Sequence, residues 1–277
     1  MNRGKDIIEL YLTIEAACQA VTQGKKLRQR GPEPDLTDAE VLTIEIFGEM
    51  QGHHDDASIW RYSKAHWQDW FPGSGSYPAF AKQSANLIHL KQKVFAYLFL
   101  PRDDVHIIDG VPMPICHLAR ASRSKPFKGE AALGFCAAKG ERYYYGFKGH
   151  VIVTLEQKIV GFTLTAANID EREVLDNMRG LLSGMLIGDK GLLSQTKQME
   201  LAEDGINLQT PLRDNMTDPR PKEVVQRLLK LRRRVETVIG QLVEYFDFAA
   251  CNARDLWHLT AKLLRKLLAY NLRSSET

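Results

Sequence analysis

Three acidic residues stand in settings that suit metal ligands: Asp109 in IIDG, Asp189 in LIGDKG and Glu236 in LRRRVETVIGQL. Both aspartates follow short apolar runs, and the glutamate lies in a basic segment with helical periodicity. Carboxylate oxygens are hard ligands that Mg²⁺ and Mn²⁺ prefer. Two such ions can activate a nucleophile, stabilise a leaving oxygen and screen phosphate charge. The pattern therefore suggests metal-dependent phosphodiester chemistry.

Each acid also has an ordinary structural explanation. An aspartate after a strand is often a turn or helix-capping residue. Glu236 would pair equally well with Arg232, four residues earlier on the same helix. An aspartate-nucleophile phosphatase also uses acids at strand ends, but it expects a second aspartate where this chain has Val111. The residues alone leave the structural explanations open.

The elements that must position these acids change character near residue 101. Before it, apolar residues recur at helical spacing, and Thr37 and Glu40 form a capping box that opens a helix running to about Met50. Further helices are expected at 56–70 and 79–100. After it, short apolar runs alternate with amphipathic segments. Strands are expected at 105–109, 143–155, 158–164, 185–188 and 206–211, and helices at 171–182, 195–203, 222–245 and 255–272.

This order of elements predicts an α/β fold in two domains. Residues 1–101 would form a small all-helical domain, and residues 102–277 a mixed sheet flanked by helices. If the apolar runs are buried strands, their ends would point Asp109 and Asp189 into one crevice. Glu236 lies beside the apolar seam of its helix, so that helix could add the third carboxylate.

Composition excludes several classes of protein. Of the 277 residues 44% are hydrophobic and 26% charged, as in soluble globular proteins, and no apolar stretch approaches the ~20 residues that span a bilayer. The first residues, MNRGKDIIELY, lack the apolar core of a secretory signal, so we expect a cytoplasmic protein without a membrane partner. The four cysteines form no CxxC pair, which indicates neither a zinc ribbon nor a disulfide framework.

Positive charge is concentrated locally although the formal net charge is only +3. Seven basic residues face two acidic ones between His117 and His150, and seven face Glu223 between Arg220 and Val235. Such segments favour a polyanionic partner, the alternative being a solvated charged face. Lys190 and Arg232 could instead pair with the three acids, and His150 could be a structural histidine. Our candidates for DNA contact are Lys25, Lys26, Arg28, Arg30, Arg120, Arg123, Lys125, Lys128, Lys148, His150, Lys190, Arg232 and Arg233.

Over most of its length the chain resembles transposases of bacterial insertion sequences, specifically the IS982 group. One signature of related transposases places tyrosine, arginine, glutamate and lysine along a helix. Arg232 and Glu236 match it, whereas Leu229 and Val243 stand where tyrosine and lysine would fall. The segments that carry the resemblance are LTDAEVLTIEIFGE, WRYSKAHW, IDGVPMPIC, ARASRSKPFKGEAALG, YYYGFKGHVIVT, TAANIDEREVLD, LIGDKG, LRRRVETVIGQL and LLAYNL.

The resemblance implies a ribonuclease-H-like catalytic domain with a DDE triad, which maps onto Asp109, Asp189 and Glu236 at separations of 189 − 109 = 80 and 236 − 189 = 47 residues. The implied reaction hydrolyses transposon ends, and the exposed 3′ hydroxyls then attack target DNA. It implies Mg²⁺ or Mn²⁺ as cofactor, with two ions expected. The implied partners are terminal inverted repeats, target DNA and a second copy in a synaptic homodimer. A noncatalytic DNA-binding descendant of a transposase is the alternative.

Overall fold

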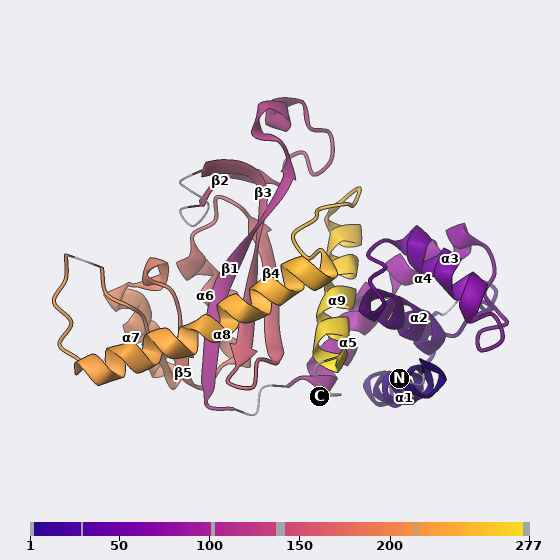
Figure 1. Ribbon diagram of the computed structural model, residues 1–277, viewed down its shortest axis with the longest axis horizontal. Coiled ribbons are helices and arrows are strands. Elements are labelled where there is room, and N and C mark those ends of the chain that lie inside the picture. The colour runs from indigo at the N-terminus through magenta and orange to yellow at the C-terminus, as the bar shows by residue number, and fades with distance from the viewer. Residues whose placement is uncertain (1–2, 29, 101–102, 137–141, 214, 274–277) are drawn as a thin grey trace. The chain divides into compact units, whose positions relative to one another are not determined.

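The chain forms two compact units in the computed structural model, which describes residues 3–28, 30–100, 103–136, 142–213 and 215–273 (Figure 1). The first unit comprises Met1–Leu98, Tyr245–Phe248 and Asp255–Thr277, and the second comprises Phe99–Glu244 and Ala249–Arg254. Among the described residues, no helix has the length and apolar content needed to cross a membrane.

The first unit is helical. Helix α2 begins at the predicted capping box: the Glu40 amide donates to the Thr37 hydroxyl at 3.2 Å, and the Thr37 amide donates to the Glu40 carboxylate at 2.7 Å. The helix expected at 56–70 ends at His66, and the one expected at 79–100 is two helices that meet at Leu87. The helices are α1 (Arg3–Thr22), α2 (Asp38–Met50), α3 (Asp56–His66), α4 (Tyr77–Asn86), α5 (Ile88–Leu98) and α9 (Leu256–Arg273).

The last helix departs from the sequence-based division of the chain. We placed all of 102–277 in one domain, but α9 packs with α2 and α5 of the first unit. Leu263, Leu267 and Leu268 of α9 are fully buried, and Ala261 and Leu264 pack against Ile88. Residues 263–271 of α9 are all buried, charged ones included, so the helix is enclosed on every side by partners that adjacency in the sequence does not reveal.

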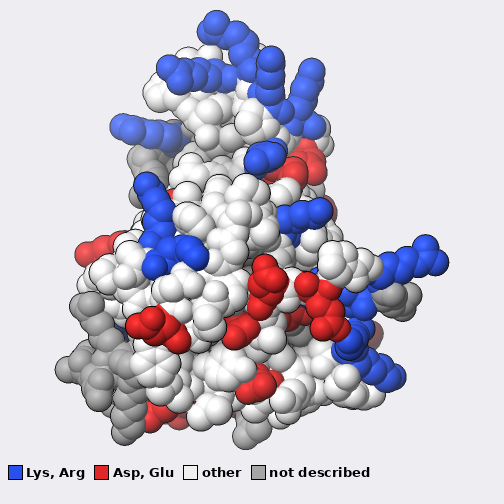
Figure 2. All heavy atoms as spheres, turned by 90° about the vertical axis from the view of Figure 1, so that its right-hand side faces the viewer, with Lys and Arg blue, Asp and Glu red and all other residues white. Residues whose placement is uncertain are grey.

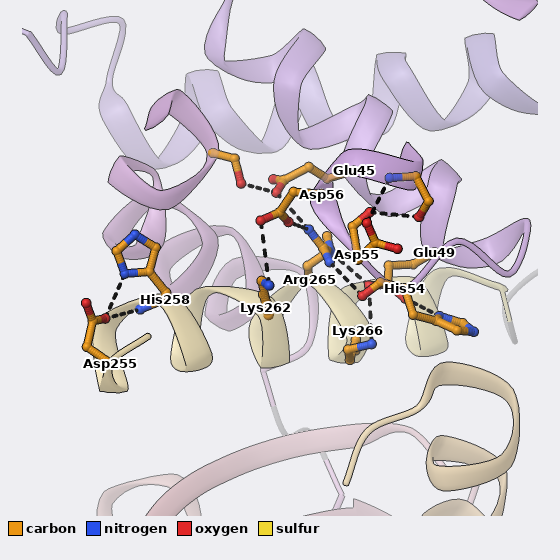
Figure 3. Close-up of polar contacts among 12 residues, drawn as sticks. Glu45, Glu49, His54, Asp55, Asp56, Asp255, His258, Lys262, Arg265 and Lys266 are labelled. Carbon is orange, nitrogen blue, oxygen red and sulfur yellow. Dashed lines mark hydrogen bonds and ion pairs between the residues drawn. The ribbon is translucent and has the colours of Figure 1, made fainter. Parts of the chain in front are cut away.

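A network of charged side chains lies inside this unit (Figure 3). Arg265 of α9 is 1% exposed, and its guanidinium lies 2.9 Å from Glu49, 3.3 Å from Glu45 and 2.5 Å from Asp56. Burial works to raise the pKa of Glu49, but Arg265, His54 and Lys266 hold it below the usual value. We call this network the Arg265 cluster; its members are Glu45, Glu49, Asp56, Lys91, Lys262, Arg265 and Lys266.

The second unit is built on a six-stranded mixed sheet, as the order of elements predicted. Its strands are β1 (Val105–Cys116), β2 (Ala132–Cys136), β3 (Arg142–Thr154), β4 (Ile159–Ala166), β5 (Gly184–Ile187) and β6 (Ile206–Gln209). The helices are α6 (Glu171–Met178), α7 (Gln195–Glu203) and α8 (Lys222–Phe246), with short 3-10 segments η1 (Leu118–Arg123), η3 (Arg179–Leu181) and η4 (Lys190–Leu192).

The sheet order is β2-β3-β1-β5-β6. The first part of β3 pairs with β2, and its later part pairs with β4. β3 pairs antiparallel with β1, β2 and β4, whereas β5 pairs parallel with β1 and β6. The expected hairpin between 143–155 and 158–164 is β3 and β4. β2 was not predicted, because its short sequence has no strong periodicity. The strand forms by pairing with the start of β3.

β1 runs seven residues beyond Asp109, where we expected it to end. That extension contains Pro112 and Pro114, and proline cannot donate a hydrogen bond to a strand ladder. β5 pairs with β1 only from Val105 to Ile107. Further along, β1 pairs with β3 alone, so the prolines lie where no described strand pairs with the opposite edge.

The two faces of the sheet have different partners. Ile108, Ile152 and Leu186 share a buried cluster with Val174 of α6 and Leu201 of α7. Side chains alternate along a strand, so Ile107 and Asp109 point to the opposite face. Helix α8 runs across that face, apart from α6 and α7 (Figure 1). The sheet therefore has one face for packing and one that carries Asp109 toward α8.

Candidate active site

Parallel strand pairing sets the two aspartates side by side. Ile107 of β1 is in register with Ile187 of β5, and each aspartate follows its isoleucine by two residues. Residues two positions apart on one strand project from the same face. Two residues that each follow an in-register pair by two positions therefore lie side by side on that face. Asp109 and Asp189 are therefore neighbours because of register, although Asp109 lies within its strand and Asp189 just beyond the end of β5.

Helix α8 supplies the third carboxylate. Val235, Val238 and Leu242 are fully buried and fix the rotation of the helix. Arg234 donates a hydrogen bond to the backbone carbonyl of Leu155, at the turn after β3. Glu236 directly follows Val235. The burial of this valine therefore brings the Glu236 carboxylate to the edge of the sheet face that carries Asp109.

The three carboxylates converge on the guanidinium of Arg232. Its Nη2 lies 3.7 Å from Asp109 Oδ2 and 3.3 Å from Glu236 Oε1, and its Nη1 lies 3.3 Å from Asp189 Oδ1. The side chain of Asp109 is 22% exposed, that of Asp189 38% and that of Glu236 49%, so the group opens to solvent on one side. The pairing of Arg232 with Glu236 that we considered as an alternative exists, but the same arginine also contacts both aspartates.

The surroundings of Asp109 raise the pKa of its carboxyl group. Burial raises its pKa to about 6; the Gly110 amide and Arg232 act in the opposite direction, and the charges of Asp189 and Glu171 raise it further. One arginine does not compensate three carboxylates. Additional positive charge would lower the pKa of Asp109 again.

The donor set suits a hard divalent cation in kind, because all three groups are carboxylates and they surround one positive charge. Asp189 precedes η4, but its side chain makes no capping hydrogen bond, which disposes of the capping explanation for that residue. Within the described part of the chain, no three acidic, histidine or cysteine side chains stand close enough, as placed, to hold one metal ion. The guanidinium of Arg232 lies between the carboxylate oxygens that would have to approach one metal ion.

Lys148 and His150 lie away from this group. In β3 they pair with Pro112 and Gly110, so they share the face of Ile108, opposite to Asp109. His150 is 2% exposed and lies 3.1 Å from the Thr165 hydroxyl, and burial, with the charge of Lys148, lowers its pKa to about 4. Because His150 is buried, its predicted contact with DNA does not fit the structure. It is the structural histidine that we kept as an alternative.

Glu171, at the start of α6, is a neighbour that sequence reasoning missed. Its Oε1 accepts a hydrogen bond from Lys148 Nζ at 2.8 Å. A side-chain carbon placed on Gly110 or Gly191 would lie 3.5 Å or 3.0 Å from the Glu171 carboxylate. This carboxylate therefore occupies the space left by two glycines that adjoin the segments of Asp109 and Asp189. The position of Glu171 after a helix cap gave no sign of this.

The other basic candidates are mostly exposed. Lys190, Arg233, Lys25 and Arg30 are exposed, as are the paired residues: Lys26 pairs with Glu33, and Arg28 lies 2.6 Å from Asp38. Figure 2 shows Lys and Arg side chains gathered at the upper end of one face, at the height of η1 in Figure 1. Lys139, which contributed to the positive count of that region, lies outside the described residues. The exposed basic side chains in and just after η1 are Arg120, Arg123, Lys125 and Lys128.

Two comparisons show what this chain is similar to. The fold is similar to a solved piggyBac transposase, from a cryo-EM structure of its synaptic complex with hairpin DNA, with a TM-score of 0.50 at 8% sequence identity. The similarity covers 96% of this chain and 72% of that one. It is a likeness of fold to a transposase.

A family model described as the transposase DDE domain matches residues 101–253, more than half of the chain. The protein therefore belongs to the family of transposase DDE domains. The matched range contains Asp109, Asp189 and Glu236. Comparison with curated proteins gave no match.

Proposed function

We propose that this protein is a DNA transposase of the IS982 type, in which Asp109, Asp189 and Glu236 form the catalytic DDE triad of a ribonuclease-H-like domain. It would bind the ends of an insertion sequence, hydrolyse phosphodiester bonds to expose 3′ hydroxyls, and join these to target DNA. The observation that carries the proposal is the convergence of three carboxylates, from β1, the end of β5 and α8, on one guanidinium.

The three carboxylates would hold Mg²⁺ or Mn²⁺, with two ions in the working state. Bound there, the metal would supply Lewis acidity and lower the pKa of a nucleophilic water or hydroxyl. The protein's own part is to hold three negative groups on rigid elements. Asp109 lies within a paired strand, and Glu236 lies on a helix that buries Val235 and Val238, so both carboxylates are set by the core.

DNA would approach across exposed basic side chains. Four of them lie in and just after η1. Lys190 directly follows Asp189, and Arg233 lies three residues before Glu236. We keep Lys25, Lys26, Arg28 and Arg30 as candidates in the first unit. Lys148 remains a candidate, although it is only partly exposed and is paired with Glu171. Cleavage of two ends in one complex would need two copies of the chain, so we infer a synaptic homodimer. With such a DNA substrate, the activity would belong in the bacterial cytoplasm.

Cleavage of end-labelled duplexes would test the function. The duplexes would carry the DNA that flanks the coding sequence on each side, and the full chain would be incubated with Mg²⁺, Mn²⁺ or EDTA. We expect metal-dependent nicks that leave 3′ hydroxyls, and none with Glu236→Gln. Asp176→Asn is the matched control, because Asp176 is an exposed carboxylate on α6 that forms an ion pair with Lys197. End binding by the wild type without any cleavage would instead support the noncatalytic DNA-binding alternative.

Salt dependence of duplex binding would test the basic region. Neutralising Arg120, Arg123, Lys125 and Lys128 together should reduce the slope of log K against log salt concentration by roughly 0.9 for each phosphate that these side chains neutralise in the wild type. An unchanged slope would remove this region from the DNA interface. That outcome would leave the result of the nicking assay valid, because nicking reports on the three carboxylates and not on the basic region.

A further inference from the structure

Arg232 provides the positive charge nearest to the three carboxylates, and it contacts all three with the two ends of one guanidinium. These contacts, at 3.3 to 3.7 Å, are longer than the ~2.7–2.9 Å of a strong charge-assisted hydrogen bond. Nε of Arg232 is buried and has no hydrogen-bond partner among the described residues. The guanidinium is therefore held by charge rather than by a complete set of hydrogen bonds.

The same oxygens cannot serve the guanidinium and a small cation at once. Mg²⁺ binds oxygen at about 2.0–2.1 Å, so carboxylates that share an ion must lie much closer together than carboxylates arranged around a planar guanidinium. Their present spacing fits the latter, since no three of the described acidic, histidine or cysteine side chains could hold a metal as placed. Binding of a cation requires Arg232 to move out and the carboxylates to move in.

We propose that Arg232 is the internal counter-ion of the metal-free site and competes with the divalent cation for Asp109, Asp189 and Glu236. The inference rests on the proposed function, in which these carboxylates bind the metal. Arg232 is thus a positioning residue: it keeps three like charges together before metal arrives, and it sets how tightly metal binds. Its removal relieves competition more than it disturbs the fold, because α8 is fixed by its buried valines and by Arg234.

The opposite role makes the opposite prediction. If Arg232 were a fixed bridge that arranges the carboxylates for metal, its loss would let them separate and would weaken metal binding. The neighbouring Arg233 offers a matched control, because it is an exposed arginine on the same turn of α8, and the ion pairs of the three carboxylates are made by Arg232 instead. Comparing the two variants separates the effect of touching the carboxylates from that of net charge.

Binding of Mn²⁺ to the metal-free full chain, measured by electron paramagnetic resonance of free Mn²⁺ and by calorimetry, would test the proposal. We expect Arg232→Met to bind Mn²⁺ about 10-fold more tightly than wild type, equivalent to about 1.4 kcal/mol. Arg232→Lys keeps the charge but cannot bridge three carboxylates, so its affinity should lie in between. Arg233→Met should bind Mn²⁺ with an affinity within about 2-fold of wild type, because exposed charges are strongly screened.

Equal or weaker Mn²⁺ binding by Arg232→Met would overturn the inference. If that variant does not fold, as judged by circular dichroism, Arg232→Lys decides: an affinity equal to or below that of wild type would also overturn it. Glu236→Gln separates the two levels of the argument. If wild type binds Mn²⁺ and Glu236→Gln does not, the metal site stands whatever Arg232 does; if neither wild type nor Arg232→Met binds Mn²⁺, the proposed function itself fails.

Discussion

The molecule contains two groups of three carboxylates around one arginine, and they differ in burial and in charge balance. In the first unit, Arg265 and its acidic partners Glu45 and Glu49 are at most 1% exposed. In the second, Arg232 is 22% exposed, and Glu236 is 49% exposed. The Arg265 ion pairs are 2.5 to 3.3 Å long, whereas those of Arg232 are 3.3 to 3.7 Å.

Charge compensation separates the two groups further. Three lysines join Arg265, so three carboxylates face four positive groups; around Arg232, three carboxylates face that arginine alone among the described residues. The pKa of Glu49 and that of Asp56 are lowered despite burial, while burial raises the pKa of Asp109 to about 6. A balanced, enclosed cluster of this kind holds helices together, whereas an under-compensated, open cluster has capacity for another cation.

The largest expected effect is on activity. Asp109→Asn should reduce metal-dependent nicking by at least about 10³-fold, because it removes a carboxylate from the proposed metal site. Circular dichroism should show an unchanged fold. Nicking at more than about a tenth of the wild-type rate would show that the open cluster is not catalytic.

The next effect contrasts the same substitution in the two clusters. Arg265→Leu should lower the free energy of unfolding by about 3–5 kcal/mol, since it removes a buried positive charge that Glu45, Glu49 and Asp56 share. Arg232→Leu should cost about 1 kcal/mol or less, because its partners are partly solvated and Asp109 can take up a proton. Urea unfolding at pH 7 would measure both.

Exposed Arg61→Leu on α3 is the control for that pair of variants. Similar losses of stability for Arg232→Leu and Arg265→Leu would mean that both arginines are structural. The distinction between a cluster for stability and a cluster for function would then disappear.

The pH dependence of stability should have opposite sign in the two clusters. The folded-state pKa of Asp109 is raised to about 6 from 3.8, so the folded protein binds the extra proton between these values and stability falls as pH rises through them. In metal-free protein, Asp109→Asn should therefore be more stable than wild type by about 3 kcal/mol at pH 8, with the gain fading toward pH 4.

For Asp56, whose pKa is lowered in the folded protein, the sign reverses. Its contribution to stability is present above the unfolded-state value and is lost as pH falls, so Asp56→Asn should destabilise most near neutral pH. Unfolding measured in urea from pH 4 to pH 8 checks both variants. A stability gain for Asp109→Asn that does not change with pH would contradict the raised pKa.

The smallest effect concerns Glu171, whose charge contributes to the raised pKa of Asp109. Glu171→Gln should lower the pKa of Asp109 by roughly a few tenths of a unit, since one nearby negative charge is removed. Carboxyl ¹³C chemical shifts followed through a pH titration would report it. Glu173→Gln, an exposed neighbour on α6, should leave the pKa where it is; equal shifts in both variants would indicate a general charge effect.

Local signals predicted individual elements well. The capping box at Thr37 placed the start of α2, and the helix expected at 195–203 is α7 with the same bounds. The mixed sheet followed from the order of strands and helices. Signals failed where a partner decided the outcome: β1 continues through two prolines because β3 pairs with it on one edge, and β2 depends on the start of β3.

The candidate site divides in the same way. The types and surroundings of Asp109, Asp189 and Glu236 indicated the chemistry, and Arg232 was recognised as a possible partner of these acids. Sequence did not reveal that Lys148 and His150 face away from Asp109, because a strand shows which residues share a side but not what covers that side. Glu171 was missed for a related reason: its place beside Gly110 and Gly191 depends on how α6 packs on the sheet.

By itself, the sequence determined which residues were available for metal-dependent chemistry, the helices with strong periodicity and caps, and the alternation that makes a mixed sheet. These depend on interactions within a few residues, so they can be read locally. The tertiary structure decided that Ile107 is in register with Ile187, that Arg232 reaches three carboxylates, and that α9 closes the first unit. Those outcomes depend on contacts between distant segments, whose energies are set by which surfaces are buried together.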